Sequence, residues 1–353
     1  MRKRVNVAVV GATGAVGTEM LRVLAERRFP VKGIRLLASE RSAGRRISFN
    51  GSTRRVEELR GRSFDGIDVA LFSAGASRSL EFAPEAVKRG ALVVDNSSAF
   101  RMAEHVPLVV PEVNPQALKR HHGLIANPNC STIILLVPLA PLHQAARITR
   151  IVVSTYQSVS GAGAKAMAQL YEETKRALRQ FTVSRERFTV KPKLSTVHGP
   201  RSTVLPAQIA FNVIPQVDAF LPNRSTREEM KMVNETRKIL EEPHLAISAT
   251  CVRVPVFVAH SEAVWIETER PLSVERARAV LRKAPGVRLV DDPAHGAYPL
   301  PIDAGGQDDV LVGRIRKDAS VRNGLALWVS GDNLRKGAAT NAVQIAELLL
   351  KGK

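Results

Sequence analysis

Three glycines at a fixed spacing, Gly11, Gly14 and Gly17, separate an apolar run over 5–10 from a helical pattern over 18–27. Glycines at a strand-to-helix turn permit a tight backbone and let N–H groups approach a pyrophosphate at the helix N-terminus. The spacing is GxxGxxG and not GxGxxG, so close packing alone could also explain it. The position between a strand and a helix nevertheless favours dinucleotide binding and a parallel sheet.

Apolar segments alternate with helical patterns along the first third of the chain. Short, nearly continuous apolar runs are typical of strands buried on both faces of a parallel sheet. The expected strands are 5–10, 33–38, 68–73, 91–95, 108–110 and 124–126, and the expected helices include 18–27, 79–89 and 115–121. The sequence therefore predicts an α/β, Rossmann-type dinucleotide-binding domain.

The pattern changes near residue 149, where the expected strands become longer and fewer. These strands are 151–158, 251–258, 263–268, 310–316 and 325–329, with helices at 164–180, 227–240 and 274–283 and an irregular stretch over 188–221. Such a mixture favours an α+β domain with an antiparallel or mixed sheet. The apolar segment over 132–146 predicts a buried helix, although it contains Pro138 and Pro141.

A length of 353 residues allows about two domains of ~150 residues. The last segment, 337–350, has the pattern of one amphipathic helix that returns to the first domain. We therefore expect a dinucleotide-binding domain of residues 1–129 and 330–353, and a second domain of residues 130–329.

The charge balance is strongly basic, with 52 Lys and Arg against 33 Asp and Glu. The basic residues are scattered and lack the long runs and interleaved aromatics of nucleic-acid-binding proteins, so neither nucleic acid nor a membrane is an expected partner. The longest apolar run, 133–142, is far shorter than the ~20 residues of a membrane-spanning helix. Two cysteines are too few for a disulfide framework, and we expect a cytoplasmic protein without a metal site.

Cys130 lies in the segment Asn127-Pro128-Asn129-Cys130-Ser131-Thr132, between a short strand and a helix. A helix N-terminus stabilises a thiolate, so we expect a lowered pKa and a nucleophile at neutral pH. Cys251 lies inside an apolar strand, where a cysteine is usually a small buried hydrophobe. His260 follows a strand that carries Arg253; it is a candidate acid–base, although such a histidine is more often structural.

The end of the second expected strand reads Ala38-Ser39-Glu40-Arg41-Ser42. NAD-specific domains usually place an acidic residue there to bind the ribose 2′-hydroxyl. Ser39, Arg41 and Ser42 instead offer hydroxyls and a guanidinium to a 2′-phosphate, which favours NADP. Glu40 would reverse this preference if it pointed inward, and an exposed polar loop without any such role is the remaining alternative.

Ordered motifs over nearly the whole length make the chain similar to the aspartate-β-semialdehyde dehydrogenase family. They are GATGAVG at 11–17, FSAG at 72–75, DNSSAFR at 95–101, VPEVN at 110–114, NPNCST at 127–132, STYQSVSGAG at 154–163, IAFNVIPQVD at 209–218, EExK at 228–231, RVPVFVAHSE at 253–262 and DNLRKGAATNAVQIAE at 332–347. Two departures are visible, namely Ala76 after Gly75, where a second glycine is common, and the high positive charge. Neither departure touches the expected chemistry.

The resemblance implies NADP-dependent conversion of L-aspartyl-4-phosphate to L-aspartate-4-semialdehyde, in the biosynthesis of lysine, threonine, methionine and diaminopimelate. It implies that Cys130 forms a thioester, that His260 is the acid–base, and that Gln157 orients the reacting groups. Arg253 would bind the substrate α-carboxylate and Glu228 its ammonium, while Arg101, Asn129 and Lys231 would bind phosphate. The second domain would also form the subunit contact of a homodimer or homotetramer. The residues expected at the cofactor are Gly11, Thr13, Gly14, Ala15, Val16, Ser39, Arg41, Ser42, Ser73, Ala74, Gly75, Ser160, Gly161 and Asn333.

The expected helix over 227–240 carries a row of charges that has two interpretations. Thr226 and Glu229 have the spacing of a capping box. Glu228, Lys231, Glu235 and Lys238 are i,i+3 and i,i+4 neighbours, and such a row is usually a solvated face. With the resemblance, Glu228 and Lys231 become site residues and Glu229 stays structural.

Two other functions remain open at this point. A related acyl-phosphate reductase, such as N-acetyl-γ-glutamyl-phosphate reductase, shares the cysteine chemistry but lacks this pair of carboxylate and ammonium ligands; acyl phosphates one carbon longer would separate the two. A basic nucleic-acid-binding protein would be recognised by retention on DNA that survives ~0.2 M salt.

Overall fold

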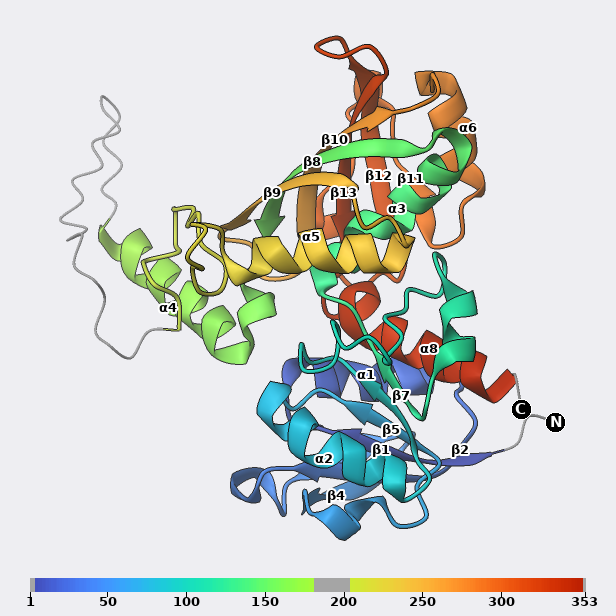
Figure 1. Cartoon of the computed structure of the whole chain (residues 1–353). Helices are drawn as coiled ribbons and strands as arrows, with labels where there is room; N and C mark the ends of the chain where they lie inside the picture. Colours follow the sequence, from blue (N-terminus) through green and yellow to red (C-terminus); the bar gives the residue numbers. More distant parts are fainter. Residues whose placement is uncertain (1–3, 181–203, 352–353) are drawn as a thin grey trace.

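Two β-sheets, each with helices packed on it, make up the computed structural model, which describes residues 4–180 and 204–351 (Figure 1). The first sheet has seven strands in the order β3-β4-β2-β1-β5-β6-β7. All neighbours pair in parallel except β3 and β4, which form a hairpin. The strands are β1 (Val5–Val10), β2 (Val31–Ala38), β3 (Arg46–Phe49), β4 (Ser52–Glu58), β5 (Val69–Phe72), β6 (Leu92–Asp95) and β7 (Leu124–Ala126).

Helices cover both faces of this sheet, which explains why its central strands are apolar throughout. In β1, Val7 and Val9 pack into a core shared with α1 (Ala15–Glu26) and α8 (Thr340–Lys351). Ala8 and Val10 point the other way, into a core shared with α2 (Ala76–Lys88). The expected Rossmann-type architecture is confirmed, and the last helix does return to this sheet.

The second sheet has six strands in the order β11-β12-β13-β10-β8-β9. It is mixed, because β8 pairs with β9 and β11 with β12 in parallel while the other neighbours are antiparallel. The strands are β8 (Ile148–Gln157), β9 (Ala246–Arg253), β10 (His260–Thr268), β11 (Val287–Leu289), β12 (Val310–Asp318) and β13 (Gly324–Gly331). The helices are α3 (Cys130–Ala146), α4 (Ala164–Gln180), α5 (Arg227–Leu240), α6 (Val274–Lys283) and the short α7 (Pro301–Ala304).

Helix α3 runs through the middle of the molecule and is apolar on every side, as expected for a buried helix (Figure 1). Pro138 and Pro141 both lie inside it. It packs on α5, α6 and the second sheet, and its first residue, Cys130, lies against Gly337 in the C-terminal segment of the chain. Cys130, the first residue of α3, is therefore placed where the two halves meet.

Several expected elements differ from the structure. Residues 108–110 form no strand and contribute a single bridge between Leu108 and Ala126, and 115–121 is a 3₁₀ helix, Pro115–Arg120. Strand β9 ends at Arg253 and not at residue 258, and His260, which follows this strand as expected, is the first residue of β10. Of the expected irregular stretch, 188–203 lies outside the described residues, and 204–221 has no helix or regular strand. Further 3₁₀ turns are Glu40–Ser42, Gly61–Phe64, Val159–Ala162 and Pro293–His295.

The C-terminal segment is not one continuous α-helix, because a π-helical turn, Arg335–Ala339, precedes α8. Arg335 is buried and pairs with Glu19 at 3.0 Å, Glu26 at 2.7 Å and Asp308 at 2.8 Å. These pairs fix the turn against α1, the helix that follows the glycine turn. Within the described residues, we find no helix that has both the length and the apolar character needed to cross a membrane.

Candidate active site

A cavity of about 840 Å³ lies at the carboxyl ends of β5 and β6, between the two halves of the molecule. In open parallel sheets this edge is where ligands bind. Predicted site residues from both halves line it, namely Val16, Ser73, Gly75, Arg101, Asn129, Cys130, Gln157, Ser160, Gly161, Glu228, Lys231, Arg253 and Asn333. Residues distant in sequence thus surround one space large enough for a substrate and part of a cofactor.

Cys130 begins α3 and is held there by the residue before it. The side-chain oxygen of Asn129 accepts hydrogen bonds from the backbone N–H groups of Ser131 at 3.1 Å and Thr132 at 3.2 Å, which caps the helix. The Cys130 sulfur lies 3.4 Å from Nε2 of His260. His260 is completely buried behind the cysteine. The imidazole is placed so that it could accept the proton of the thiol, as covalent catalysis by a cysteine requires.

The protonation states of this pair follow from burial and neighbouring charges. Burial, helped by Glu228, raises the pKa of Cys130 to about 12, while Arg101 and Arg253 oppose the rise. The expected lowering of this pKa by the helix N-terminus is therefore wrong for the free site. Burial, followed by the charge of Arg253, holds the pKa of His260 well below its usual range. A neutral thiol therefore faces a neutral imidazole, and the thiol needs that base to react.

Gln157, at the end of β8, reaches across the floor of the cavity. Its side-chain amide donates to the Ser131 hydroxyl at 2.9 Å and to Glu228 at 3.2 Å. The amide of Asn129 donates to the same Glu228 oxygen at 2.9 Å. Gln157 and Asn129 thus orient the Glu228 carboxylate toward the start of α3.

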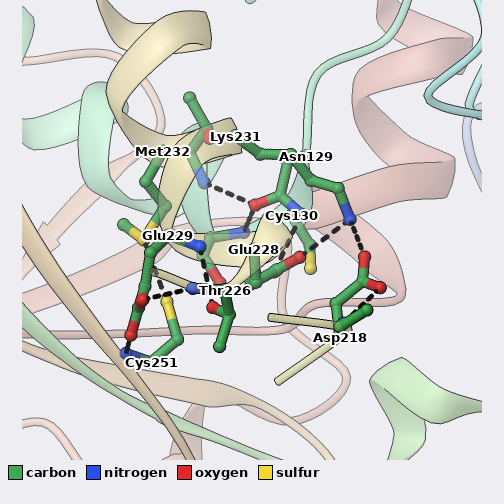
Figure 2. A network of polar contacts seen from close by, with 12 residues as sticks. Asn129, Cys130, Asp218, Thr226, Glu228, Glu229, Lys231, Met232 and Cys251 are labelled. Carbon is green, nitrogen blue, oxygen red and sulfur yellow. Dashed lines mark hydrogen bonds and ion pairs between the residues drawn. The ribbon is translucent and has the colours of Figure 1, made fainter. Parts of the chain in front are cut away.

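Lys231 lies between two carboxylates, as Figure 2 shows. Its ammonium group is 3.1 Å from Glu228 and 2.8 Å from Asp218. Burial alone would lower the pKa of Lys231, but these two carboxylates raise it, so the lysine stays charged. No role was expected for Asp218, although it ends the IAFNVIPQVD motif quoted for the family.

Glu235 on α5 differs most from expectation. It belongs to the row of charges expected on a solvated face, but its side chain is buried and the residue is 1% exposed. Its carboxylate accepts from Arg101 at 3.0 Å and from the backbone N–H of Asn129 at 2.6 Å. Lys238, one turn later, donates to three backbone carbonyls, including that of Arg101. The solvated-face interpretation is therefore wrong for this row. The capping box of Thr226 and Glu229, in contrast, is confirmed.

Arg253 projects from the end of β9 toward the cysteine and is 6% exposed. One Nη donates to the Ser158 carbonyl at 2.7 Å. Its Nε is buried and has no hydrogen-bond partner among the described residues. The guanidinium therefore has N–H donors that remain for a ligand in the cavity. Its planar, forked geometry suits a carboxylate.

A second cavity of about 400 Å³ lies over the glycine turn. Its lining includes the predicted cofactor residues Gly11, Thr13, Gly14, Ser39, Arg41, Ser42, Ser73 and Ala74, together with Glu40 and Arg78. Ser73 also lines the larger cavity, so the two spaces adjoin there. Ala15 begins α1 between Gly14 and Val16, which line the smaller and the larger cavity.

The residues of the glycine turn fit a dinucleotide. Gly11 has φ +87°, and a Cβ there would meet the Ser73 carbonyl oxygen at 2.7 Å. A Cβ on Gly17 would meet the Gly11 carbonyl oxygen at 2.1 Å, so both positions require glycine. The buried Ser73 hydroxyl has no partner among the described residues, which leaves it for a ligand.

The π-helical turn before α8 packs directly on Cys130. A Cβ on Gly337 would lie 2.9 Å from Cβ of Cys130, so this position has room for glycine alone. Asn333, just before the turn, accepts hydrogen bonds from the hydroxyls of Ser158 and Ser160 and from the backbone N–H of Ala259. Asn333 was expected near the cofactor, whereas no sequence pattern indicated the contact between Gly337 and Cys130.

The family descriptions that match the chain divide it in the same way as the two sheets. "Semialdehyde dehydrogenase, NAD binding domain" matches residues 6–121, and "Semialdehyde dehydrogenase, dimerisation domain" matches residues 139–336. The aspartate-semialdehyde dehydrogenase of Bacillus subtilis is 52% identical over 352 residues, which are 99% of each chain. That of Aquifex aeolicus is 53% identical over 349 residues, or 98% of each chain. The chain belongs to the aspartate-semialdehyde dehydrogenase family.

Solved structures of aspartate-semialdehyde dehydrogenases share this fold. Aspartate semialdehyde dehydrogenase II of Vibrio cholerae, complexed with ASA, has a TM-score of 0.91 and 47% identity over 99% of both chains. The enzyme of Candida albicans with NADP has a TM-score of 0.72 and 25% identity over 98% of both chains. The family resemblance found in the motifs is therefore confirmed over the full length.

Proposed function

We propose that the chain catalyses the NADP-dependent reductive dephosphorylation of L-aspartyl-4-phosphate to L-aspartate-4-semialdehyde through a thioester on Cys130. This reaction would serve the biosynthesis of lysine, threonine, methionine and diaminopimelate. The observation that carries the proposal is the 3.4 Å contact between Cys130 and the buried His260, with Cys130 lining a cavity that Arg253 and Glu228 also line. The family membership supports the substrate.

The cysteine and histidine account for the bond changes. The Cys130 sulfur attacks the acyl carbon as its proton passes to Nε2 of His260, and the carbon–oxygen bond to phosphate breaks to leave a thioester. Bound NADPH would supply hydride to the thioester carbon. His260 returns its proton to the carbonyl oxygen, which forms a hemithioacetal. The carbon–sulfur bond then breaks as the hydroxyl proton passes through His260 to the sulfur, which releases the aldehyde and restores the thiol.

Substrate positioning is assigned to the charged groups around this pair. Arg253 would bind the α-carboxylate with its free guanidinium donors, and Glu228 would accept from the substrate ammonium. Arg101, Asn129 and Lys231 would bind the phosphate. The Arg101 guanidinium donates three hydrogen bonds, to Glu235 and to two backbone carbonyls. These bonds fix the orientation of the guanidinium and leave two N–H groups for an anion.

The test is a spectrophotometric assay of NADP reduction with L-aspartate-4-semialdehyde and phosphate. We expect NADPH formation that requires both the aldehyde and phosphate, because phosphate must cleave the thioester. N-acetyl-L-glutamate-5-semialdehyde should be a poor substrate, since an acetylated nitrogen cannot donate to Glu228 as an ammonium does. Activity with the longer aldehyde alone would overturn the assignment.

We propose NADP as the cofactor because the smaller cavity is lined by Ser39, Arg41, Ser42 and also Arg78. Hydroxyls and guanidinium groups suit a ribose 2′-phosphate. Glu40 lines the same cavity and would weaken this preference if it reached the ribose.

Replacing Ser39 by aspartate should lower the preference for NADP over NAD by about 10-fold or more, through repulsion of the 2′-phosphate and a new acceptor for the 2′-hydroxyl. The measurement is kcat/KM for each cofactor. Ser52→Asp, on the exposed β3–β4 hairpin, adds the same charge outside the cavity and serves as control. An unchanged ratio of kcat/KM for NADP to kcat/KM for NAD in Ser39→Asp would show that this loop does not bind the 2′-phosphate.

We propose that the chain forms a homodimer, or a homotetramer built from it, through the second sheet. Helices α3, α5 and α6 cover one face of that sheet. The other face presents aromatic side chains, with the rings of Tyr156 and Trp328 only 5.2 Å apart and Trp265 partly exposed on the same face. The match to a dimerisation domain over this sheet supports a second copy as its partner.

We also propose the domain boundaries stated above, residues 1–129 with 330–353 and residues 130–329. The strands of the first sheet end at Ala126, and those of the second end at Gly331. The packing of α8 on α1 supports the assignment of the C-terminus to the first domain.

A further inference from the structure

Asp218 is a charged residue of the large cavity to which the proposed reaction gives no task. It lines this cavity together with Glu228 and Lys231 (Figure 2). Its Oδ2 lies 2.8 Å from the Lys231 ammonium, and its Oδ1 accepts from the backbone N–H of Ala219 at 2.8 Å. The side chain of Asp218 is 35% exposed, against 7% for Glu228. Asp218 is therefore the more accessible of the two carboxylates that pair with Lys231.

The backbone holds Asp218 in a conformation that few residues adopt. Its φ is +68°, in the left-handed region that is open mainly to glycine, asparagine and aspartate. Val217, just before it, is buried in the hydrophobic core that contains α3. The carbonyl of Ala219, just after it, accepts from the backbone N–H of Arg227 on α5 at 2.8 Å. The chain on both sides is thus anchored, and the carboxylate is fixed beside Lys231.

The Asp218 side chain is an ionised carboxylate. Burial would raise its pKa, but the hydrogen bonds from Lys231 and from the Ala219 backbone outweigh burial, and the pKa lies below its ordinary value. An ionised carboxylate accepts hydrogen bonds and donates none. Its oxygens therefore attract a ligand atom that carries a hydrogen and repel one that carries only negative charge.

Each cation of the proposed phosphate subsite is already paired with a carboxylate. Arg101 pairs with Glu235 at 3.0 Å, and Lys231 pairs with Glu228 and Asp218. An anion without any hydrogen gains little in this subsite, because the neighbouring carboxylates repel it. Inorganic phosphate keeps at least one P–OH group at pH 7, whereas sulfate has no hydroxyl at this pH. Phosphate can therefore donate to a carboxylate that repels sulfate.

We propose that Asp218 selects the oxyanion of the reaction: its carboxylate accepts a hydrogen bond from the hydroxyl of a tetrahedral oxyanion such as phosphate, while Lys231 binds another oxygen of the same ion. This proposal deepens the proposed function and rests on its phosphate subsite. The Lys231 ammonium has three N–H groups, so one remains for the ion after the pairs with Asp218 and Glu228. Asp218 is a specificity-determining residue and takes no part in making or breaking bonds.

The test compares phosphate, arsenate and sulfate as ions that protect Cys130 from iodoacetamide at pH 7 and constant ionic strength. Cys130 lines the same cavity, so an ion bound beside Lys231 should slow its alkylation. Arsenate also keeps a hydroxyl at this pH, so it shows whether the hydroxyl decides. In the unmodified chain, we expect phosphate and arsenate to give half-protection at a concentration at least about 10-fold below that of sulfate, as for one hydrogen bond to a charged group.

Asp218→Asn removes the negative charge, keeps a side-chain oxygen for the Ala219 N–H, and suits the left-handed backbone. The half-protecting concentration of sulfate should fall by about 10-fold, because the repulsion is lost. That of phosphate should change by less than about threefold, because the lost repulsion offsets the weakened hydrogen bond. In the oxidative assay, the Ki of sulfate against phosphate should fall by the same factor, while KM for the aldehyde stays within about twofold.

Asp318→Asn is the matched control, since it removes a carboxylate at the end of β12 whose oxygen also accepts from a backbone N–H. It should leave the preference for phosphate over sulfate unchanged. Lys231→Ala should instead weaken protection by both ions, because it removes the positive charge that they share.

Equal protection by phosphate and sulfate in the unmodified chain would overturn the proposal without any variant. An unchanged preference in a folded Asp218→Asn chain would also overturn it, as would an effect confined to KM for the aldehyde, which would place Asp218 at the substrate ammonium. Alkylation needs no turnover, so protection by phosphate in a chain that does not oxidise L-aspartate-4-semialdehyde would count against the proposed reaction alone. If phosphate gave no protection at all, the phosphate subsite would be wrong, and this role of Asp218 would fall with it.

Discussion

Replacing Cys130 by alanine should reduce turnover by about 10⁴-fold or more and leave the Kd for NADP within about twofold. The thiol sulfur is the atom that would form the covalent bond, and it lies 3.4 Å from Nε2 of His260, the proposed base. The cofactor cavity over the glycine turn does not include Cys130. Steady-state rates and a fluorescence titration with NADPH measure the two effects separately.

Cys251→Ser is the matched control for this substitution. Cys251 is completely buried on β9, where its sulfur lies 3.7 Å from the sulfur of Met232, and burial raises its pKa above the ordinary range. We expect activity close to that of the unmodified chain and much slower alkylation by iodoacetamide at pH 7 than for Cys130. Ordinary turnover in Cys130→Ala, or equal labelling of both cysteines in the folded chain, would contradict the assignment of the nucleophile.

The fold could be predicted from periodicity because burial on two faces leaves a clear pattern. In β1, side chains that point to α1 and side chains that point to α2 are equally apolar, which identifies a covered parallel strand. The short strand expected over 108–110 is not formed, and here the sequence contained no clear pattern of burial. Three apolar residues give no periodicity, and the side chain of Asn114 takes the backbone groups of Leu108 and Val110 that a sheet would use.

The candidate site could be predicted less well, because polar residues on a helix do not show which side faces solvent. Glu228, Glu235 and Lys238 have the spacing of an exposed row, yet all three turn toward backbone or cavity groups from segments more than 90 residues away. Glu228 and Lys231 could still be predicted as site residues, because they belong to the EExK motif of the family. Nothing in the sequence distinguished Glu235, whose partners Arg101 and Asn129 are known only from the fold.

The pKa of Cys130, the proposed nucleophile, was also predicted poorly from the sequence. A helix N-terminus lowers the pKa of a thiol, but its contribution is of order 1 kcal/mol and is outweighed by burial and by Glu228. Both opposing influences depend on tertiary structure. Gly337 is a further example, because the requirement for glycine comes from a π-helical turn against Cys130 that no local pattern indicated.

Arg253 and Lys231 are both positively charged groups in one cavity, and the proposed substrate carries two different anions. Their environments differ in a way that supports the proposed assignment of each residue to one anion. Arg253 has one hydrogen bond to a backbone carbonyl and a free fork near the cysteine. The Lys231 ammonium is a compact charge that is already paired with Glu228 and Asp218. Such a group suits the binding of phosphate, which enters after the aldehyde has reacted.

Arg253→Lys and Lys231→Ala should therefore fail in different ways in the oxidative direction. Arg253→Lys keeps the charge but loses the fork, so KM for the aldehyde should rise and kcat should fall, together by about 100-fold, because the substrate is misplaced relative to Cys130. Lys231→Ala should mainly raise the KM for phosphate, by about 10-fold, because the aldehyde reacts before phosphate is needed.

Steady-state kinetics with aldehyde and phosphate varied independently would show this crossed pattern. Arg227→Ala, which removes an exposed positive charge one turn before Lys231, controls for a general change in the local potential. It should leave both constants within about twofold, as expected for a surface charge in water. If Arg253→Lys and Lys231→Ala raised only the KM for phosphate, the α-carboxylate would have to bind elsewhere, and the guanidinium fork beside Cys130 would belong to the phosphate.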